Sequence, residues 1–147
     1  MGRTIAWATL AAGTFDILFA AILSLVRDRE PADMLRFVAS GPFAAATGWG
    51  AAGAWLGLAV HFALMGAMAA VFVIAAQRRP AMTEQPIQWG VIYGLLTYVV
   101  MNLIVVPLRF PVAWPPKPIG IATQLFAHIV LVGIPIALIA ARCLRTR

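Results

Sequence analysis

The sequence is short of charged residues, and it contains a single cysteine. Only 11% of its 147 residues are Asp, Glu, Lys or Arg, against about 25% in a typical soluble domain, while 63% are hydrophobic. So few polar side chains could not cover a water-soluble particle of this size. Because Cys143 is alone, an intramolecular disulfide framework is excluded. The mean hydropathy of +0.92 instead indicates one small integral membrane domain, residues 1–147.

Basic residues outnumber acidic ones, eleven to five, but they do not form a nucleic-acid patch. They lie between the apolar runs and are not interleaved with aromatic residues. We interpret them as topology signals and as contacts for the headgroups of anionic lipids. The expected partner is therefore a lipid bilayer and not a nucleic acid.

Four apolar segments reach the length of about 20 residues that a membrane-spanning helix needs. They cover residues 4–26, 53–76, 88–108 and 119–141. No segment shows the ten-residue alternation of a membrane β-barrel, and strands of an open sheet would leave backbone groups unpaired in lipid. The sequence predicts an all-α integral membrane protein, a bundle of four transmembrane helices.

The two loops on one side of the bundle have different characters. In residues 31–40, Pro31 suits a helix start and the following apolar residues form one stripe, which favours either a short interfacial helix or an ordinary structured loop. The stretch "PLRFPVAWPPKP" (107–118) contains five prolines, which disfavour regular helix through it. We expect a rigid connector there in preference to a lid.

An even number of spans leaves both termini on the same side of the membrane. That side carries six basic residues and the other side carries five, so the positive-inside rule gives a small preference for cytoplasmic termini. Tryptophans stand near both expected interfaces, as aromatic belts do. They are Trp7 and Trp89 on the terminal side and Trp49, Trp55 and Trp114 on the other.

Each predicted span carries polar side chains in the same half of the bilayer. Counted at 1.5 Å per residue from the non-terminal ends, they lie at depths between ~8 and ~15 Å. This polar layer consists of Asp16, His61, Asn102, Gln124 and His128, with Tyr98 one turn from Asn102. A common depth lets these groups meet, provided that their helix faces converge.

Small residues stand at steps of four from these polar groups and therefore share their helix faces. The glycines concerned are Gly53, Gly57, Gly90, Gly94 and Gly120, while Ala12 and Ala20 flank Asp16. Small residues let membrane helices approach closely. We therefore expect the small and polar stripes to face the interior of the bundle.

A charged aspartate in mid-membrane costs about 2.5–3.5 kcal/mol on insertion scales. Asp16 can avoid that cost by remaining protonated, or by pairing with an imidazole that gains the proton. His61 and His128 are both candidates for this pairing, because the sequence gives depth but not the order of helices.

Four motifs resemble a group of small uncharacterised bacterial inner-membrane proteins that is broadly similar to the YagU family. They are "ASG" (39–41), "AWLGLAVHF" (54–62), "YGLLTYVVMNLIVVPL" (93–108) and "HIVLVGIP" (128–135). Where relatives often have Leu-Gln after the arginine of the first loop, this chain has Arg36-Phe37. The resemblance implies four helices in a bacterial inner membrane, and it implies no activity.

Three functions fit the polar layer, and the favoured one is an interaction or accessory bundle in a homo-oligomer or a larger membrane complex. The second is a proton-coupled small-solute carrier, which with four spans would act as an oligomer. The third is a haem or metal protein that uses His61 and His128, with Asp16 completing a metal site. No cofactor is assigned, because the motifs that attach one are absent.

An enzyme is not expected. The sequence contains no nucleophile elbow, metalloprotease motif or phosphate loop. Intramembrane hydrolysis by Asp16 would need a second carboxylate at its depth, and no other span supplies one.

Overall fold

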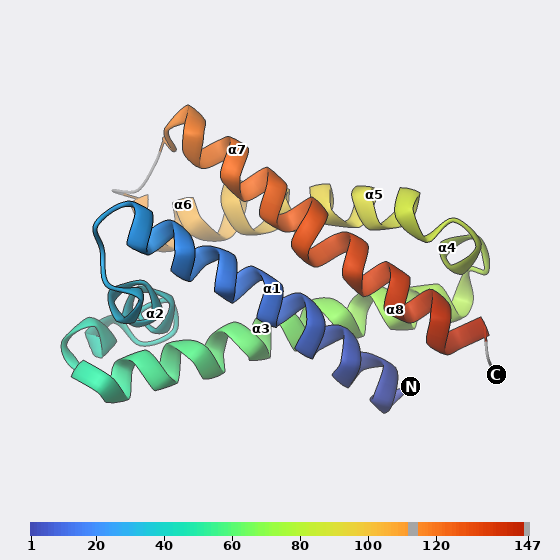
Figure 1. The fold of residues 1–147 in the computed structure, drawn as a ribbon, viewed down its shortest axis with the longest axis horizontal. Coiled ribbons are helices and arrows are strands. Elements are labelled where there is room, and N and C mark those ends of the chain that lie inside the picture. Colours follow the sequence, from blue (N-terminus) through green and yellow to red (C-terminus); the bar gives the residue numbers. More distant parts are fainter. Residues whose placement is uncertain (112–114, 146–147) are drawn as a thin grey trace.

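The structure is a computed structural model that describes residues 1–111 and 115–145. Throughout these residues the regular elements are helical and no strand occurs, which confirms the predicted all-α class. Four continuous helical rods are long and apolar enough to cross a membrane: Gly2–Val26, Gly50–Arg78, Pro86–Arg109 and Pro118–Arg145. Each predicted span lies within one of them. Figure 1 shows the rods running along the long axis, with both termini at one end.

The first two rods are single helices, α1 (Gly2–Val26) and α3 (Gly50–Arg78). The last two change their winding in the middle. The third rod consists of α5 (Pro86–Tyr98), the π-helical η2 (Val99–Val105) and α6 (Val106–Arg109). The fourth consists of α7 (Pro118–Phe126), the π-helical η4 (Ala127–Gly133) and α8 (Ile134–Arg145).

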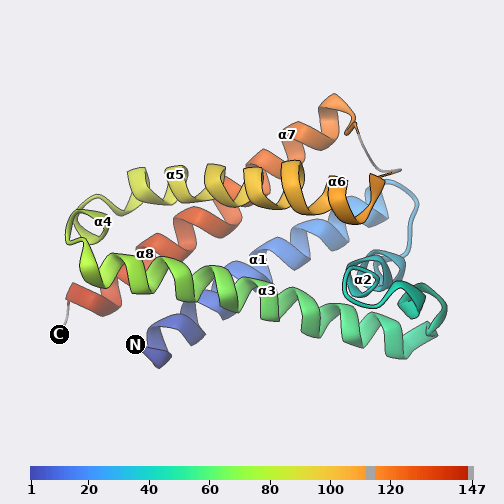
Figure 2. The ribbon, with the colours of Figure 1, turned by 180° about the vertical axis from the view of Figure 1, so that it is seen from behind.

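Shorter helices occupy the connections. The helix predicted at 31–40 is present as α2 (Pro31–Ala39), and it is followed by a 3₁₀ turn, η1 (Ala44–Gly48). Figures 1 and 2 show α2 nearly end-on, so its axis runs across the rods, as that of a helix lying along a membrane surface does. At the terminal end of the bundle, α4 (Ala81–Glu84) joins the second and third rods.

A proline follows each π-helical segment at the same spacing, Pro107 after η2 and Pro135 after η4. Proline lacks an N–H, and its ring collides with the carbonyl group four residues earlier in an α-helix. A wider turn relieves that collision, and the backbone N–H groups of Val106 and Ile134 indeed bond five residues back, to Met101 and Ile129. The predicted span 88–108, which includes Pro107, is therefore confirmed, and the expectation that the prolines from Pro107 onward disfavour helix is wrong at this residue, because Val106–Arg109 is helical.

The rest of the proline-rich loop is only partly described. Residues 112–114, which include Trp114, lie outside the described residues. The prediction of a rigid connector therefore stays a prediction there.

The glycine stripes make close contacts, but not all with the expected partners. A Cβ at Gly57 would overlap the backbone carbonyl group of Leu35 in α2, and one at Gly53 would overlap that of Ala46 in η1. These two glycines thus let the interfacial segment approach α3, and not another span as expected. This difference arises because a helix face made of glycine can pack closely against any backbone beside it. The sequence does not specify whether that backbone belongs to another span or to a loop segment.

The glycines of the third rod do pack against another span. A Cβ at Gly90 would lie 2.7 Å from Cα of Ile134, and one at Gly94 would lie 2.6 Å from Cα of Ile129. Gly120 differs, since no heavy atom of the described residues beyond its own helix turn lies within 4 Å of its Cβ position. The expected close packing at Gly120 is therefore absent from the described chain.

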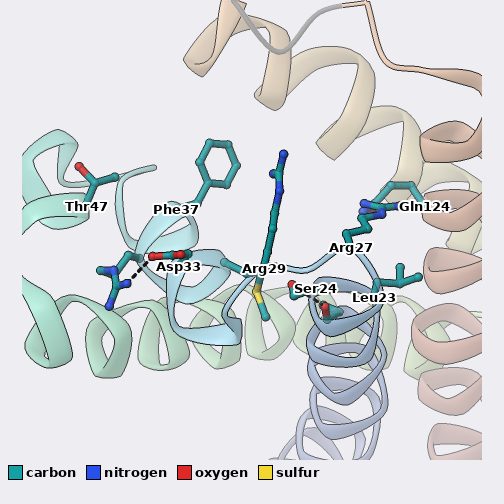
Figure 3. A pocket seen from close by; sticks show the side chains of 11 residues that line it. Leu23, Ser24, Arg27, Arg29, Asp33, Phe37, Thr47 and Gln124 are labelled. Atoms are coloured by element: carbon teal, nitrogen blue, oxygen red, sulfur yellow. Dashed lines mark hydrogen bonds and ion pairs between the residues drawn. The ribbon is translucent and has the colours of Figure 1, made fainter.

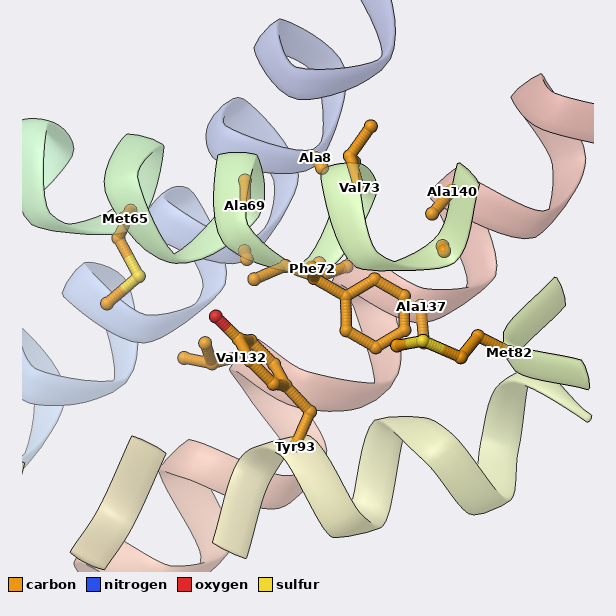
Figure 4. Packing of buried hydrophobic residues seen from close by; sticks show 13 residues of the cluster. Ala8, Met65, Ala69, Phe72, Val73, Met82, Tyr93, Val132, Ala137 and Ala140 are labelled. Atoms are coloured by element: carbon orange, nitrogen blue, oxygen red, sulfur yellow. The ribbon is translucent and has the colours of Figure 1, made fainter. Parts of the chain in front are cut away.

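An apolar core fills the terminal half of the bundle and joins all four rods (Figure 4). Its largest fully buried apolar side chains are Phe72, Val73, Val132 and Ile136. The hydroxyl group of Tyr93 donates a hydrogen bond to the backbone oxygen of Met68 (2.7 Å), which ties α5 to α3. This half of the bundle is closed, and the polar groups lie towards the other half.

Candidate functional site

The polar cluster begins where α1 and α3 cross. His61 is buried, and its Nε2–H donates a hydrogen bond of 2.9 Å to the backbone oxygen of Gly13. Because a carbonyl oxygen can only accept, the proton on Nε2 is fixed by this contact. Gly13 permits the approach, since a Cβ there would lie 2.6 Å from the ring of Phe62.

The second ring nitrogen of His61 faces Asp16. Nδ1 of His61 lies 3.9 Å from Oδ2 of Asp16, beyond hydrogen-bond distance. In the described part of the chain no hydrogen bond reaches the Asp16 carboxyl group. The aspartate thus contributes no hydrogen bond to the packing of the helices.

This arrangement is suited to holding one movable proton. With Nε2 already protonated, Nδ1 of His61 is either an unprotonated acceptor or the second N–H of an imidazolium ion. A proton on the Asp16 carboxyl group would face the first form, and an ionised carboxylate would face the second. Moving the proton between the two groups needs an approach of about 1 Å, to normal hydrogen-bond length.

His128 stands at the edge of the cluster, in the π-helical η4. It is buried, and its Nδ1–H donates a 2.9 Å hydrogen bond to the backbone oxygen of Gln124 in its own rod. The Tyr98 ring lies edge-on to it, with the ring centres 5.9 Å apart. Asp16 lies within electrostatic reach of both histidines. The structure therefore brings together Asp16, His61, His128 and Tyr98.

The two amide side chains of the predicted layer do not join this cluster. Asn102 is partly exposed in η2, and Gln124 is exposed on α7. No hydrogen bond of either side chain occurs among the described residues. A place in the same half of the bilayer was therefore not sufficient, because helix rotation also decides which side chains meet.

A pocket of about 470 Å³ opens beside the cluster, among the end of α1, α2 and α7 (Figure 3). Ala20 and Gln124 form part of its wall, and each stands one helical turn from a cluster residue, Asp16 and His128 respectively. Charged groups line its outer part, namely Arg27, Arg29, Asp33 and Arg36. The pocket thus lies on the non-terminal side of the polar cluster, while the apolar core lies on the other side.

Each histidine ring has one nitrogen that could still ligate a metal or haem. Within the described residues, no group of three or more His, Cys, Asp or Glu side chains could hold a metal ion. Nε2 of His61 is engaged with Gly13 and Nδ1 of His128 with Gln124, so each ring would have to ligate through its other nitrogen. In His61 that nitrogen faces Asp16.

Three residues that shape the site or hold the surrounding helices together were not predicted from the sequence. Gly13, Tyr93 and Arg109 each take part in a contact between elements distant in sequence. Only Gly13 carried a usable signal, as a glycine one turn from an intramembrane aspartate. The other two resemble ordinary interfacial or core residues.

Comparisons of the chain with protein-family models, with curated proteins and with solved structures found no match. The fold and the site define the class themselves. This is a small membrane protein of four apolar helical spans, in which a partly buried aspartate faces a buried histidine.

Proposed function

We propose that this protein is a proton-coupled carrier of small solutes in which Asp16 and His61 bind and release the coupling proton. The observation that carries the proposal is the separation of 3.9 Å between Asp16 Oδ2 and His61 Nδ1, in a histidine whose other nitrogen is fixed by Gly13. Ionisable residues inside a span commonly mark the path of a proton or an ion.

The shape of the molecule supports the same proposal. A carrier exposes its site to one side at a time, and the pocket between α1, α2 and α7 comes within one helical turn of Asp16 and His128 on one side of the cluster. On the other side, the apolar core with Phe72 and Ile136 closes the bundle. Because four spans are few for a carrier, we propose an oligomer in a bacterial inner membrane as the working form.

A second candidate is an interaction or accessory bundle whose polar residues only hold helices together. It is favoured by the hydrogen bonds of His61 and Tyr93, which both end on backbone oxygens of a neighbouring rod. Such contacts stabilise membrane proteins by about 0.6 kcal/mol on average. Asp16 distinguishes the two candidates, because it makes no contact of this kind.

Two variants separate proton binding from packing. Asp16→Asn removes the titrating carboxyl group at nearly constant volume. His61→Gln places an amide N–H near Gly13 and removes the imidazole. The carbonyl stretch of a protonated carboxyl group, measured by infrared difference spectroscopy between about pH 5 and about pH 8, should be present in the wild type and absent from Asp16→Asn. His61→Gln should retain the fold and shift the pH at which the band appears.

Transport is tested in proteoliposomes that contain a pH-sensitive dye, under an imposed proton gradient. Succinate, lysine and glucose serve as an anionic, a cationic and a neutral probe. We expect one of them to accelerate proton uptake in the wild type and none to do so in Asp16→Asn. Equal proton flux in the two proteins, whether measurable or zero, would exclude the carrier and leave the accessory bundle.

A further inference from the structure

The charged side chains that line the outer part of the pocket carry a net positive charge. Three arginines and one aspartate line it, and the aspartate is already used, because Asp33 forms an ion pair with Arg36 in α2. Arg36 also donates a hydrogen bond to the backbone oxygen of Gly50 (3.4 Å). Within the described residues, the guanidinium groups of Arg27 and Arg29 have neither a hydrogen-bond nor an ion-pair partner.

The turn that ends α1 holds these two arginines at the pocket. Asp28 adopts a left-handed conformation (φ 54°), and the backbone N–H groups of Asp28 and Arg29 bond to the oxygens of Leu25 and Ser24. This is a Schellman motif, which reverses the chain over the helix end. Arg27 and Arg29 consequently extend into the same space between α2 and α7 (Figure 3).

The rest of the wall suits an amphipathic ligand. Ser24 and Gln124 supply polar groups, while Leu23, Met34 and Phe37 supply apolar ones. The pocket lies where the spans end, which is the level of lipid headgroups. Its volume of about 470 Å³ falls within the usual range of small-molecule sites and exceeds the need of a single small ion.

We propose that this pocket is a phosphate-binding site in which Arg27 and Arg29 bind the phosphate group. Guanidinium groups are well suited to this role, because their paired N–H donors match two phosphate oxygens. The apolar part of the wall favours the headgroup of an anionic lipid as the source, and soluble phosphate is the other source of the same chemistry. The site is separate from the Asp16–His61 cluster and does not depend on the proposed transport.

The test measures lipid binding by the purified protein with native mass spectrometry. Phosphatidylglycerol is the anionic probe and phosphatidylcholine the zwitterionic one. We expect Arg27→Gln/Arg29→Gln to bind phosphatidylglycerol about thirtyfold more weakly than the wild type, since each basic residue near an anionic headgroup contributes about a factor of five. Phosphatidylcholine binding should change little.

Arg78→Gln/Arg79→Gln is the matched control, because it removes the same charge from two exposed arginines at the opposite end of the bundle. It should retain phosphatidylglycerol binding. Arg27→Lys/Arg29→Lys keeps the charge but loses the paired donors, and it should bind a few times more weakly than the wild type. This variant also guards against a loss of folding in the glutamine pair.

Soluble phosphate is tested separately, by titrating inorganic phosphate into the protein in phosphatidylcholine nanodiscs. Saturable binding that the Arg27→Gln/Arg29→Gln pair abolishes would identify soluble phosphate as a source. If neither probe distinguishes that pair from the wild type, or if the Arg78/Arg79 control loses binding equally, the proposal is wrong.

Discussion

At the scale of single residues, two glycines with the same sequence pattern pack in different ways. Gly57 and Gly120 both stand four residues before a polar group in the sequence, at His61 and Gln124. One of them is pressed against a backbone carbonyl group and the other lies in open space. The sequence pattern is the same, so only the tertiary neighbour separates a required glycine from a dispensable one.

The paired substitutions Gly57→Ala and Gly120→Ala test this difference. The first should destabilise the protein by about 1–3 kcal/mol, because a Cβ would force the backbone of α2 away from α3. The second should be neutral or stabilise by up to about 1 kcal/mol, because alanine favours helix. Thermal unfolding in detergent measures both, and equal effects would contradict the contact between Gly57 and Leu35.

The residue scale also shows which part of the site was predictable. Hydropathy and counting along each span identified Asp16, His61 and His128 as residues of similar depth, and the structure gathers these three. Asn102 was expected in the same half of the bilayer, at a smaller depth of ~9 Å, and it does not join them. Its position was counted along an ideal α-helix, whereas η2 is wider and changes the direction of the residues after Tyr98.

At the scale of elements, α2 is fastened to the bundle at both of its sides. Gly57 of α3 receives its backbone, and Arg109 of α6 donates hydrogen bonds to the oxygens of Ser40 (2.7 Å) and Gly41 (2.6 Å) at its C-terminal end. A cation at this end is favourable, because the helix dipole is negative there. The rings of Phe37 and Phe110, 4.4 Å apart, add an apolar contact between the same elements.

Arg109→Gln should therefore loosen α2 without unfolding the rods. Losing hydrogen bonds from a charged donor costs about 1.5–3 kcal/mol each when buried and less here, where the arginine is exposed. We expect amide hydrogen exchange in Pro31–Ala39 to accelerate by about tenfold, with the rods unchanged. Arg78→Gln, at the far end, should leave α2 unaffected, and unaltered exchange in Arg109→Gln would contradict the proposed fastening.

The spans themselves could be predicted from the sequence because their cause is local. A bilayer requires each crossing segment to be long, apolar and internally hydrogen-bonded, whatever its neighbours are. The local sequence does not determine in this way which neighbouring element packs against each helix face. The contact of Gly53 and Gly57 with the interfacial segment depended on an arrangement that the local sequence does not specify.

At the scale of the whole molecule, the orientation in the membrane is predicted from a small charge difference. The terminal side carries six basic residues and the opposite side five, so the sequence predicts cytoplasmic termini only by a narrow margin. The proposed phosphate site would then face away from the cytoplasm. Orientation therefore decides which leaflet supplies its ligand.

Single-cysteine labelling determines this orientation, because Cys143 is the only native cysteine. In a Cys143→Ser background, Thr47→Cys reports the side of η1 and Glu84→Cys that of α4, both at exposed positions. With a membrane-impermeant maleimide on intact bacterial cells made permeable only at the outer membrane, Thr47→Cys should react and Glu84→Cys should not. The reverse pattern would place the termini outside the cytoplasm.

The pairing of α1 with α3 has a consequence for how the protein is made. Asp16 precedes His61 by 45 residues, so at about 5–20 residues per second the ribosome needs roughly 2–9 s to supply its partner. During that interval the first helix carries a carboxyl group with no imidazole beside it. Either it enters the lipid as the neutral acid, or it waits in the insertion machinery until α3 emerges. The rate of translation between these two codons thus sets how long the nascent chain spends in that state.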